Sequence, residues 1–322
     1  MIAAIVGTKA ILDPADAAMI HGFIINKFRG DPALFADGYA QIESLSGWRG
    51  FGVVPWLGAT ARLPSEDAVV LERGGTRPGG AKLIACPILP RISNFDDFDP
   101  LKLESGVDLH MIPPGQPIPA EAALIILPGS KATVADLAAL RNEGWDIDIL
   151  GHHRRGGLIL GLCGGYQMLG RGIADPDGLE GPPGHASGLG LLDVETTLHA
   201  RKALRAVSGM ALGAPFQGYE MHMGQTSGPD TERPFALLSD GRRDGATNAG
   251  GTVFGTYVHG LLADTEQRRA LLSRIDIAAG GLDYGNSVEA ALDEIASGLE
   301  EHLDIDALVA LARTGAKSGD RA

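Results

Sequence analysis

The sequence predicts an α/β protein built on a parallel β-sheet. Short apolar runs that suit buried strands alternate along the chain with segments of helical periodicity. Glycine accounts for 46 of the 322 residues and stands mainly at the ends of the apolar runs, where such a fold has its loops. These two observations favour a parallel sheet with helices on both faces.

The first part of the chain is expected to supply three strands and one helix. Apolar content and periodicity place the strands at 2–6, 21–28 and 51–57, and the helix at 31–45. Proline and glycine then become dense and the apolar periodicity is lost, which predicts a linker over 76–81. A length of 322 residues suits about two domains.

A second series of strands and helices follows the linker. Its expected strands are 82–89, 107–112, 122–130, 158–160 and 252–258, and its expected helices are 133–145, 288–302 and 304–313. The predicted organisation is a first domain over 1–75, a second over 82–275 and a C-terminal helical extension over 276–322.

The composition argues against several classes of protein. Because 40 acidic residues outnumber 27 basic ones, no basic surface favours nucleic acid. Two cysteines do not make a disulfide framework and suggest a reducing compartment. No apolar run reaches the roughly 20 residues of a spanning helix, and the start lacks a charged leader. We expect a cytoplasmic protein with no nucleic-acid or membrane partner, and we assign no residues as metal ligands.

Cys163 is the candidate nucleophile. It follows the apolar run 158–160 within GLCGG and precedes a segment that can start a helix. A reactive residue between small neighbours at a strand-to-helix turn is typical of a nucleophile elbow. Cys86 lies inside an expected strand without such a turn, and we expect it to be structural.

His259 is the candidate base, because it stands at the end of the expected strand 252–258. His222 and Glu220 alternate on another expected strand, so their side chains can point to the same face. They are weaker candidates for a part in this site. An oxyanion hole could use the backbone N–H of Gly164 together with that of Gly129 or Ser130, in the turn after the third strand of the second domain.

Seven segments together resemble the cobyric acid synthase family of class I, cysteine–histidine glutamine amidotransferases. They are IVGTKAILDP, FIINKFRGD, ISNFDDFDPL, LPGSKAT, GLCGGYQMLG, GYEMHMG and YVHGLL. The resemblance implies a flavodoxin-like glutaminase domain preceded by the C-terminal part of a P-loop-type, dethiobiotin-synthetase-like ATP-binding domain. It also implies that Cys163 attacks glutamine, that His259 moves the proton, and that Gln167 belongs to the glutamine site.

The same resemblance implies the wider reaction. Ammonia from glutamine would amidate four carboxylates of a corrinoid, adenosylcobyrinic acid a,c-diamide, with ATP and Mg²⁺, giving cobyric acid for cobalamin biosynthesis. Asn26 and Lys27 would read the nucleobase. The phosphate-loop motif of the family is missing from this sequence, so a longer gene or a separate chain would supply that half.

Two points are left open by the sequence. Many class I glutaminases carry Glu two residues after the histidine, but Leu261 stands there. Glu220 and His222 are the substitutes we consider for orienting His259. The competing functions are a corrinoid a,c-diamide synthase, a glutaminase subunit of a cell-wall ligase, and a truncated scaffold without catalytic activity.

Overall fold

The computed structural model describes residues 1–64 and 80–318 and divides into two compact units. The smaller unit combines Met1–Leu63 with Asn286–Ala322, and the larger unit is Pro64–Gly285. Residues 76–79 of the predicted linker lie outside the described residues.

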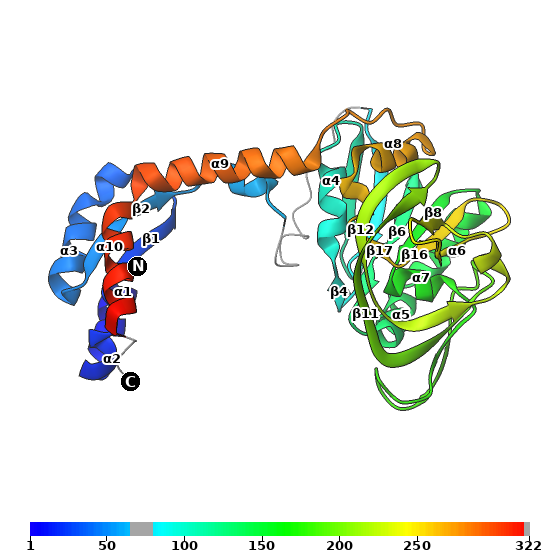
Figure 1. Cartoon of the computed structure of the whole chain (residues 1–322), viewed down its shortest axis with the longest axis horizontal. Helices are drawn as coiled ribbons and strands as arrows, with labels where there is room; N and C mark the ends of the chain where they lie inside the picture. Colours follow the sequence, from blue (N-terminus) through cyan, green and yellow to red (C-terminus); the bar gives the residue numbers. More distant parts are fainter. Residues whose placement is uncertain (65–79, 319–322) are drawn as a thin grey trace. The chain divides into compact units, whose positions relative to one another are not determined.

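The larger unit is built on a six-stranded sheet (Figure 1). Its spatial order is β15 (Ala246–Thr247), β16 (Val253–Thr256), β8 (Leu158–Leu162), β6 (Leu124–Leu127), β3 (Lys82–Pro87) and β5 (Val107–Ile112). All neighbours pair in parallel except the edge strand β15. Numbered along the chain, the five parallel strands follow the order 2-1-3-4-5, which defines the flavodoxin-like fold and confirms that prediction.

Burial on both faces explains why these strands are almost wholly apolar. Every residue of β6 and β8 is buried. Because successive side chains point to opposite faces, Ile125 and Ile159 enter one core and Leu124 and Leu160 enter the other. The helices of this unit are α4 (Asp99–Lys102), α5 (Thr133–Asn142), α6 (Trp145–Arg154), α7 (Gly164–Leu169) and α8 (Thr265–Ser273).

A second sheet carries a long hairpin, drawn in green to yellow-green in Figure 1. Its main path is β10 (Gly184–Ser187), β9 (Gly172–Asp175), β11 (Glu195–Ala211), β12 (Ala214–Ser227) and β17 (Val258–His259). Off this path, β13 (Ala236–Leu238) pairs with β11, and β14 (Arg243–Asp244) pairs with β13. Tyr257 alone separates β16 of the first sheet from β17 of the second. The chain therefore changes sheets directly before His259.

The smaller unit contains a two-stranded parallel sheet of β1 (Gly22–Phe28) and β2 (Arg49–Pro55). Its helices are α1 (Ile2–Ile11), α2 (Pro14–Ala18), α3 (Ala36–Ser46), α9 (Tyr284–His302) and α10 (Ile305–Ser318). The helices α9 and α10 thus belong almost entirely to the same compact unit as the N-terminal segment, and do not form an appendage of the larger unit.

The strand expected at 2–6 is wrong, because this segment is the first turn and a half of α1. A five-residue apolar run does not distinguish a strand from a helix, and Ala3 and Ala4 within the run, with Lys9 and Ala10 after it, favour the helix. None of the described helices is both long enough and apolar enough to cross a bilayer.

Candidate active site

Cys163 stands at a strained turn between β8 and α7. Its backbone has φ 51° and ψ −108°, a conformation that residues other than glycine rarely adopt. The Cys163 N–H donates to the carbonyl of Thr256 in β16 (2.8 Å), and the Cys163 carbonyl accepts from Gln167 N (3.1 Å). This is the geometry expected of a nucleophile elbow.

Two glycines allow this turn to pack closely against its neighbours. A β-carbon on Gly164 would lie 2.9 Å from Ser130 N, and one on Gly165 would lie 2.1 Å from the carbonyl oxygen of Leu127. Side chains at these positions would force β6 and β7 (Gly129–Ser130) away from the nucleophile.

His259 is held in one orientation by a buried carboxylate that sequence reasoning missed. His259 Nδ1 lies 2.7 Å from Asp97 Oδ2, and the other oxygen of Asp97 accepts from Gly260 N (2.6 Å). Because a carboxylate accepts, Nδ1–H donates and Nε2 remains for chemistry. Tyr219 stacks on the imidazole (5.4 Å between ring centroids), and its hydroxyl accepts from Asn94 Nδ2 (2.7 Å).

The electrostatic environment favours a charged imidazole. Burial alone would lower the pKa of His259, which is 1% exposed. Hydrogen bonding and charge from Asp97, together with the interaction with Cys163, outweigh burial and raise that pKa to about 10. His259 is therefore a cation beside Cys163 at neutral pH. A neighbouring cation is one of the features that make a cysteine reactive.

The backbone around Ser130 supplies a candidate oxyanion donor. In the antiparallel pair of β4 (Ile92–Ser93) with β7, Lys131 N donates to Arg91 O (2.9 Å). Hydrogen-bonded and non-hydrogen-bonded pairs alternate, so Gly129 N–H points to β4 and Ser130 N–H points away from it. Of the two predicted donors from this turn, the geometry favours Ser130, next to Gly164.

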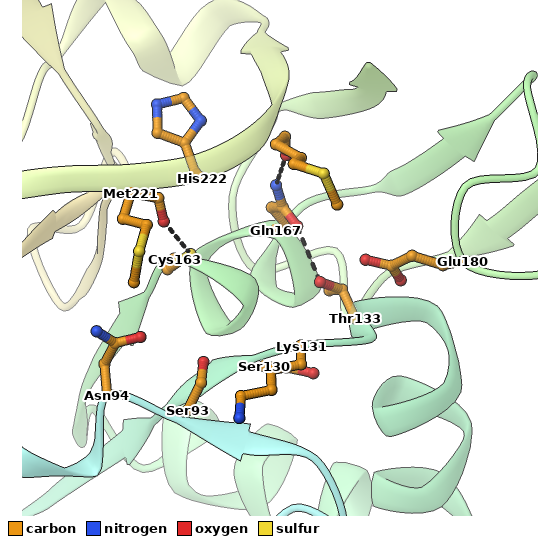
Figure 2. Close-up of a pocket in the computed structure, with 11 residues that line it drawn as sticks. Ser93, Asn94, Ser130, Lys131, Thr133, Cys163, Gln167, Glu180, Met221 and His222 are labelled. Atoms are coloured by element: carbon orange, nitrogen blue, oxygen red, sulfur yellow. Dashed lines mark hydrogen bonds between the residues drawn. The ribbon is translucent and has the colours of Figure 1, made fainter. Parts of the chain in front are cut away.

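A cavity of about 240 Å³ opens beside Cys163 (Figure 2). In Figure 2, Ser93, Asn94 and Ser130 line the side opposite Met221 and His222. Glu180 lies at a further side, beyond Gln167 and Thr133; the other lining residues are Lys131 and Met223. The cavity thus offers both a carboxylate and an ammonium group within reach of a nucleophile.

Gln167 and His222 belong to the wall of this cavity through fixed contacts. The Gln167 side chain is 2% exposed, donates to Met223 O (2.9 Å) and to the Tyr257 hydroxyl (3.2 Å), and accepts from Thr133 Oγ1 (3.1 Å). His222 stacks on Tyr257 with 3.8 Å between ring centroids. Both predicted site residues therefore lie at the pocket, and both contact Tyr257.

Neither His222, whose Nδ1 lies 3.2 Å from Gly224 O, nor Glu220 orients His259, and that prediction is wrong. The Glu220 carboxylate lies 2.9 Å from Arg242 Nη1 and 3.4 Å from Arg205 Nε. The sequence carried one signal for the correct residue, because Asp97 lies within ISNFDDFDPL, a segment that contributes to the resemblance.

The remaining residues singled out from the sequence lie outside this pocket. Asn26 and Lys27 are exposed at the end of β1 in the smaller unit, where Asn26 Oδ1 accepts from Lys27 N (2.8 Å) and Lys27 has a φ of 55°. Cys86 is buried in β3, and burial raises the pKa of its thiol well above the usual range. The described residues contain no group of three or more His, Cys, Asp or Glu side chains placed to hold a metal ion.

Residues 83–267 match the model of the CobB/CobQ-like glutamine amidotransferase domain. The chain belongs to this glutamine amidotransferase family. The match covers more than half of the chain and includes Cys163, His259 and Asp97. The α/β fold of the larger unit agrees with that membership.

Curated relatives of this CobB/CobQ-like chain are named cobyric acid synthase. The protein of Novosphingobium aromaticivorans is 84% identical over 312 residues, which are 97% of this chain and 64% of that protein. The protein of Rhizorhabdus wittichii is 73% identical over 98% of this chain and 65% of its own length. The chain therefore spans less than two thirds of the length of these relatives.

Solved structures of low identity also resemble this CobB/CobQ-like chain. The PurLQS structure from Thermotoga maritima has a TM-score of 0.44 and 19% identity, and covers 66% of this chain and 99% of its own. A glutamine amidotransferase from Thermotoga maritima has a TM-score of 0.37 and 12% identity, and covers 68% of this chain and 93% of its own.

Proposed function

We propose that the larger unit hydrolyses glutamine with Cys163 as nucleophile, and that the released ammonia amidates carboxylates of a corrinoid, adenosylcobyrinic acid a,c-diamide, to give cobyric acid. The observation that carries the glutaminase part is the buried His259–Asp97 pair beside a cysteine at a strained elbow. The corrinoid part is supported by the names of the relatives.

The first half of the reaction forms a thioester. The Cys163 thiolate attacks the side-chain amide carbon of glutamine, and the carbonyl electron pair moves onto oxygen. The N–H groups of Ser130 and Gly164 stabilise this oxyanion; one such donor typically contributes 10²- to 10³-fold in rate. His259 gives its Nε2 proton to the amide nitrogen as the C–N bond breaks, which releases ammonia.

The second half regenerates the enzyme. Neutral His259 accepts a proton from water, and the resulting hydroxide attacks the γ-glutamyl thioester. The C–S bond breaks, glutamate leaves, and the Cys163 thiolate is again paired with the His259 imidazolium. Asp97 remains a carboxylate throughout and keeps Nδ1–H in place.

The cavity residues suit the remaining groups of free glutamine. Glu180 is an anion at the side of the cavity, where it can pair with the α-ammonium group, although one of its oxygens already accepts from Val134 N (2.9 Å). Lys131 can pair with the α-carboxylate. The side-chain amide would then extend past Gln167 towards Cys163.

The smaller unit is proposed to be the C-terminal portion of the ATP-binding domain. Parallel sheets are almost always covered on both faces and contain more than two strands. Here β1 and β2 stand alone within the described residues, and Ile11, Ile24 and Leu34 are 86%, 41% and 87% exposed. We infer that further polypeptide, from a longer chain or a separate one, completes this unit.

ATP and Mg²⁺ would bind mainly to that further polypeptide. Asn26 and Lys27 fit contacts to a nucleobase, but the sequence has no glycine-rich loop ending in Lys-Ser or Lys-Thr for the phosphates. No step of the ATP chemistry is therefore assigned to residues of this chain. Two free cysteines suit a reducing compartment, which supports our proposal of a cytoplasmic protein.

Glutamate release from glutamine by the purified chain tests the proposal. We expect slow hydrolysis that Cys163→Ser abolishes and that Cys86→Ala, the control, retains. Hydrolysis by Cys163→Ser at the rate of the unchanged chain would refute the nucleophile. Amidation of a corrinoid diamide with ATP by this chain alone would refute the need for further polypeptide.

A further inference from the structure

A buried carboxylate outside the pocket anchors the point where the chain changes sheets. Asp244 in β14 is 4% exposed and does not line the cavity. Its Oδ2 accepts from the Thr256 hydroxyl, and both of its oxygens lie 3.3 Å from Tyr257 N. The Thr256 hydroxyl oxygen in turn accepts from Val258 N (3.1 Å).

These contacts provide hydrogen-bond acceptors for backbone N–H groups that neither sheet pairs. β16 ends at Thr256 and β17 begins at Val258, so Tyr257 lies between the two ladders. A buried N–H without an acceptor is costly, and Asp244 with Thr256 supplies acceptors for two successive amides.

Residues 256–258, the junction between the two sheets, contact both the Cys163 turn and the wall of the cavity. The Thr256 carbonyl accepts from Cys163 N (2.8 Å), and the Tyr257 side chain contacts Gln167 and His222. One residue beyond the junction stands His259. A shift of the junction would therefore change the separation of Cys163 and His259 without removing either.

We propose that Asp244 is a positioning residue for the glutaminase reaction, holding the 256–258 junction so that Cys163 and His259 keep their reactive separation. This inference rests on the proposed function of the larger unit. Displacement of reacting groups by about 1 Å can cost on the order of 10²-fold in rate.

The charge state of Asp244 provides a readout that a purely structural role would not give. Burial raises the pKa of Asp244 to about 6, against hydrogen bonds from Thr256 and Tyr257 that lower it. The charged groups that interact electrostatically with Asp244 are Glu220 and Arg242, and the Tyr166 hydroxyl also interacts with it. Protonation removes an acceptor from the junction, so reactivity at Cys163 should fall as the pH drops through about 6.

The experiment compares Asp244→Asn and Asp244→Ala in the full chain, with Asp240→Asn as the matched control. Asp240 forms an ion pair with Arg242, which also acts electrostatically on Asp244, but Asp240 is exposed. The readouts are kcat and KM for glutamine hydrolysis and the rate of Cys163 labelling by an electrophilic glutamine analogue. We expect Asp244→Ala to lower kcat and labelling by about 10- to 100-fold with a smaller change in KM, and the control to change neither.

Asp244→Asn keeps the shape and one acceptor, so it decides the question if Asp244→Ala does not fold. We expect its labelling rate to be reduced above pH 6 and to lack the acid limb near that pH. Asp244→Asn lacks the buried charge that the unchanged chain gains as the pH rises from about 4 to 6. Over this range the melting temperature of Asp244→Asn should therefore rise relative to that of the unchanged chain. The unchanged chain is thus relatively more stable at the acid end, where its reactivity is lost.

Labelling of a folded Asp244→Asn at the unchanged rate and with the unchanged pH profile would overturn the positioning role. If the unchanged chain neither hydrolyses glutamine nor reacts at Cys163, the proposed function fails instead. The two failures are therefore distinguishable.

Discussion

Replacing Asp97 by Asn tests the proposed catalytic arrangement most directly. A pKa of about 10 for His259, against an ordinary value of 6.5, corresponds to about 5 kcal/mol in favour of the imidazolium. Burial opposes this charge, and Asp97 makes the largest favourable contribution. Asp97 also accepts two hydrogen bonds, from His259 and Gly260, which the single carbonyl oxygen of Asn cannot serve in the same geometry.

We expect Asp97→Asn to lose most of this preference, and kcat/KM for glutamine hydrolysis to fall on the order of 10²- to 10³-fold. Alkylation of Cys163 by a haloacetamide should slow at neutral pH, because the thiolate loses its cationic partner. Asp96→Asn is the control, since His259 Nδ1 is already bonded to Asp97. Activity and alkylation of Asp97→Asn within threefold of the unchanged chain would refute the reasoning.

Three further outcomes follow from the structure. The raised pKa of His259 stabilises the fold below about pH 6.5, and thermal melts should show this stabilisation disappearing as the pH rises towards 10, with a much smaller loss in Asp97→Asn. Glu104→Gln breaks the buried pair with Arg268 (2.6 Å) and should cost about 3–5 kcal/mol in denaturant unfolding, whereas Asp304→Asn, in an exposed pair, should cost under about 1 kcal/mol. Gly165→Ala should lower stability by about 1–3 kcal/mol and abolish labelling of Cys163 in mass spectra; labelling at the unchanged rate would contradict the close packing.

The parallel sheet was predictable because its strands are buried on both faces. Segments such as 158–160 and 122–130 carry continuous apolar runs that end in glycine turns. These features can be recognised in the sequence without knowledge of tertiary contacts. The run at 2–6 failed because its length suits either a strand or a helix. The grouping of α9 and α10 with the N-terminal segment depends on contacts between residues more than 200 positions apart, which periodicity does not encode.

The proposed nucleophile and the proposed base could both be selected from local chemistry. The glycines next to Cys163 indicate a candidate nucleophile, and the position of His259 directly after an apolar strand indicates a candidate base. Asp97 has no such local signature, because it follows the two-residue strand β4 on a short 3₁₀ helix, Phe95–Phe98. Its role arises only when β17 brings His259 beside that turn.

Glu220 and Asp97 differ in what surrounds them, and this difference decides which carboxylate orients His259. Glu220 pairs with Val258 across β12 and β17, so its side chain starts within one residue of the histidine. Arg242 and Arg205 take up its charge, which leaves its oxygens directed away from the imidazole. Within the described part of the chain, the hydrogen bonds to the Asp97 carboxylate come from His259 and from the neutral backbone N–H of Gly260, so its charge acts on the imidazole. Proximity in a strand register therefore predicts a partner only when competing cations are absent, and those cations come from parts of the chain that the register does not reveal.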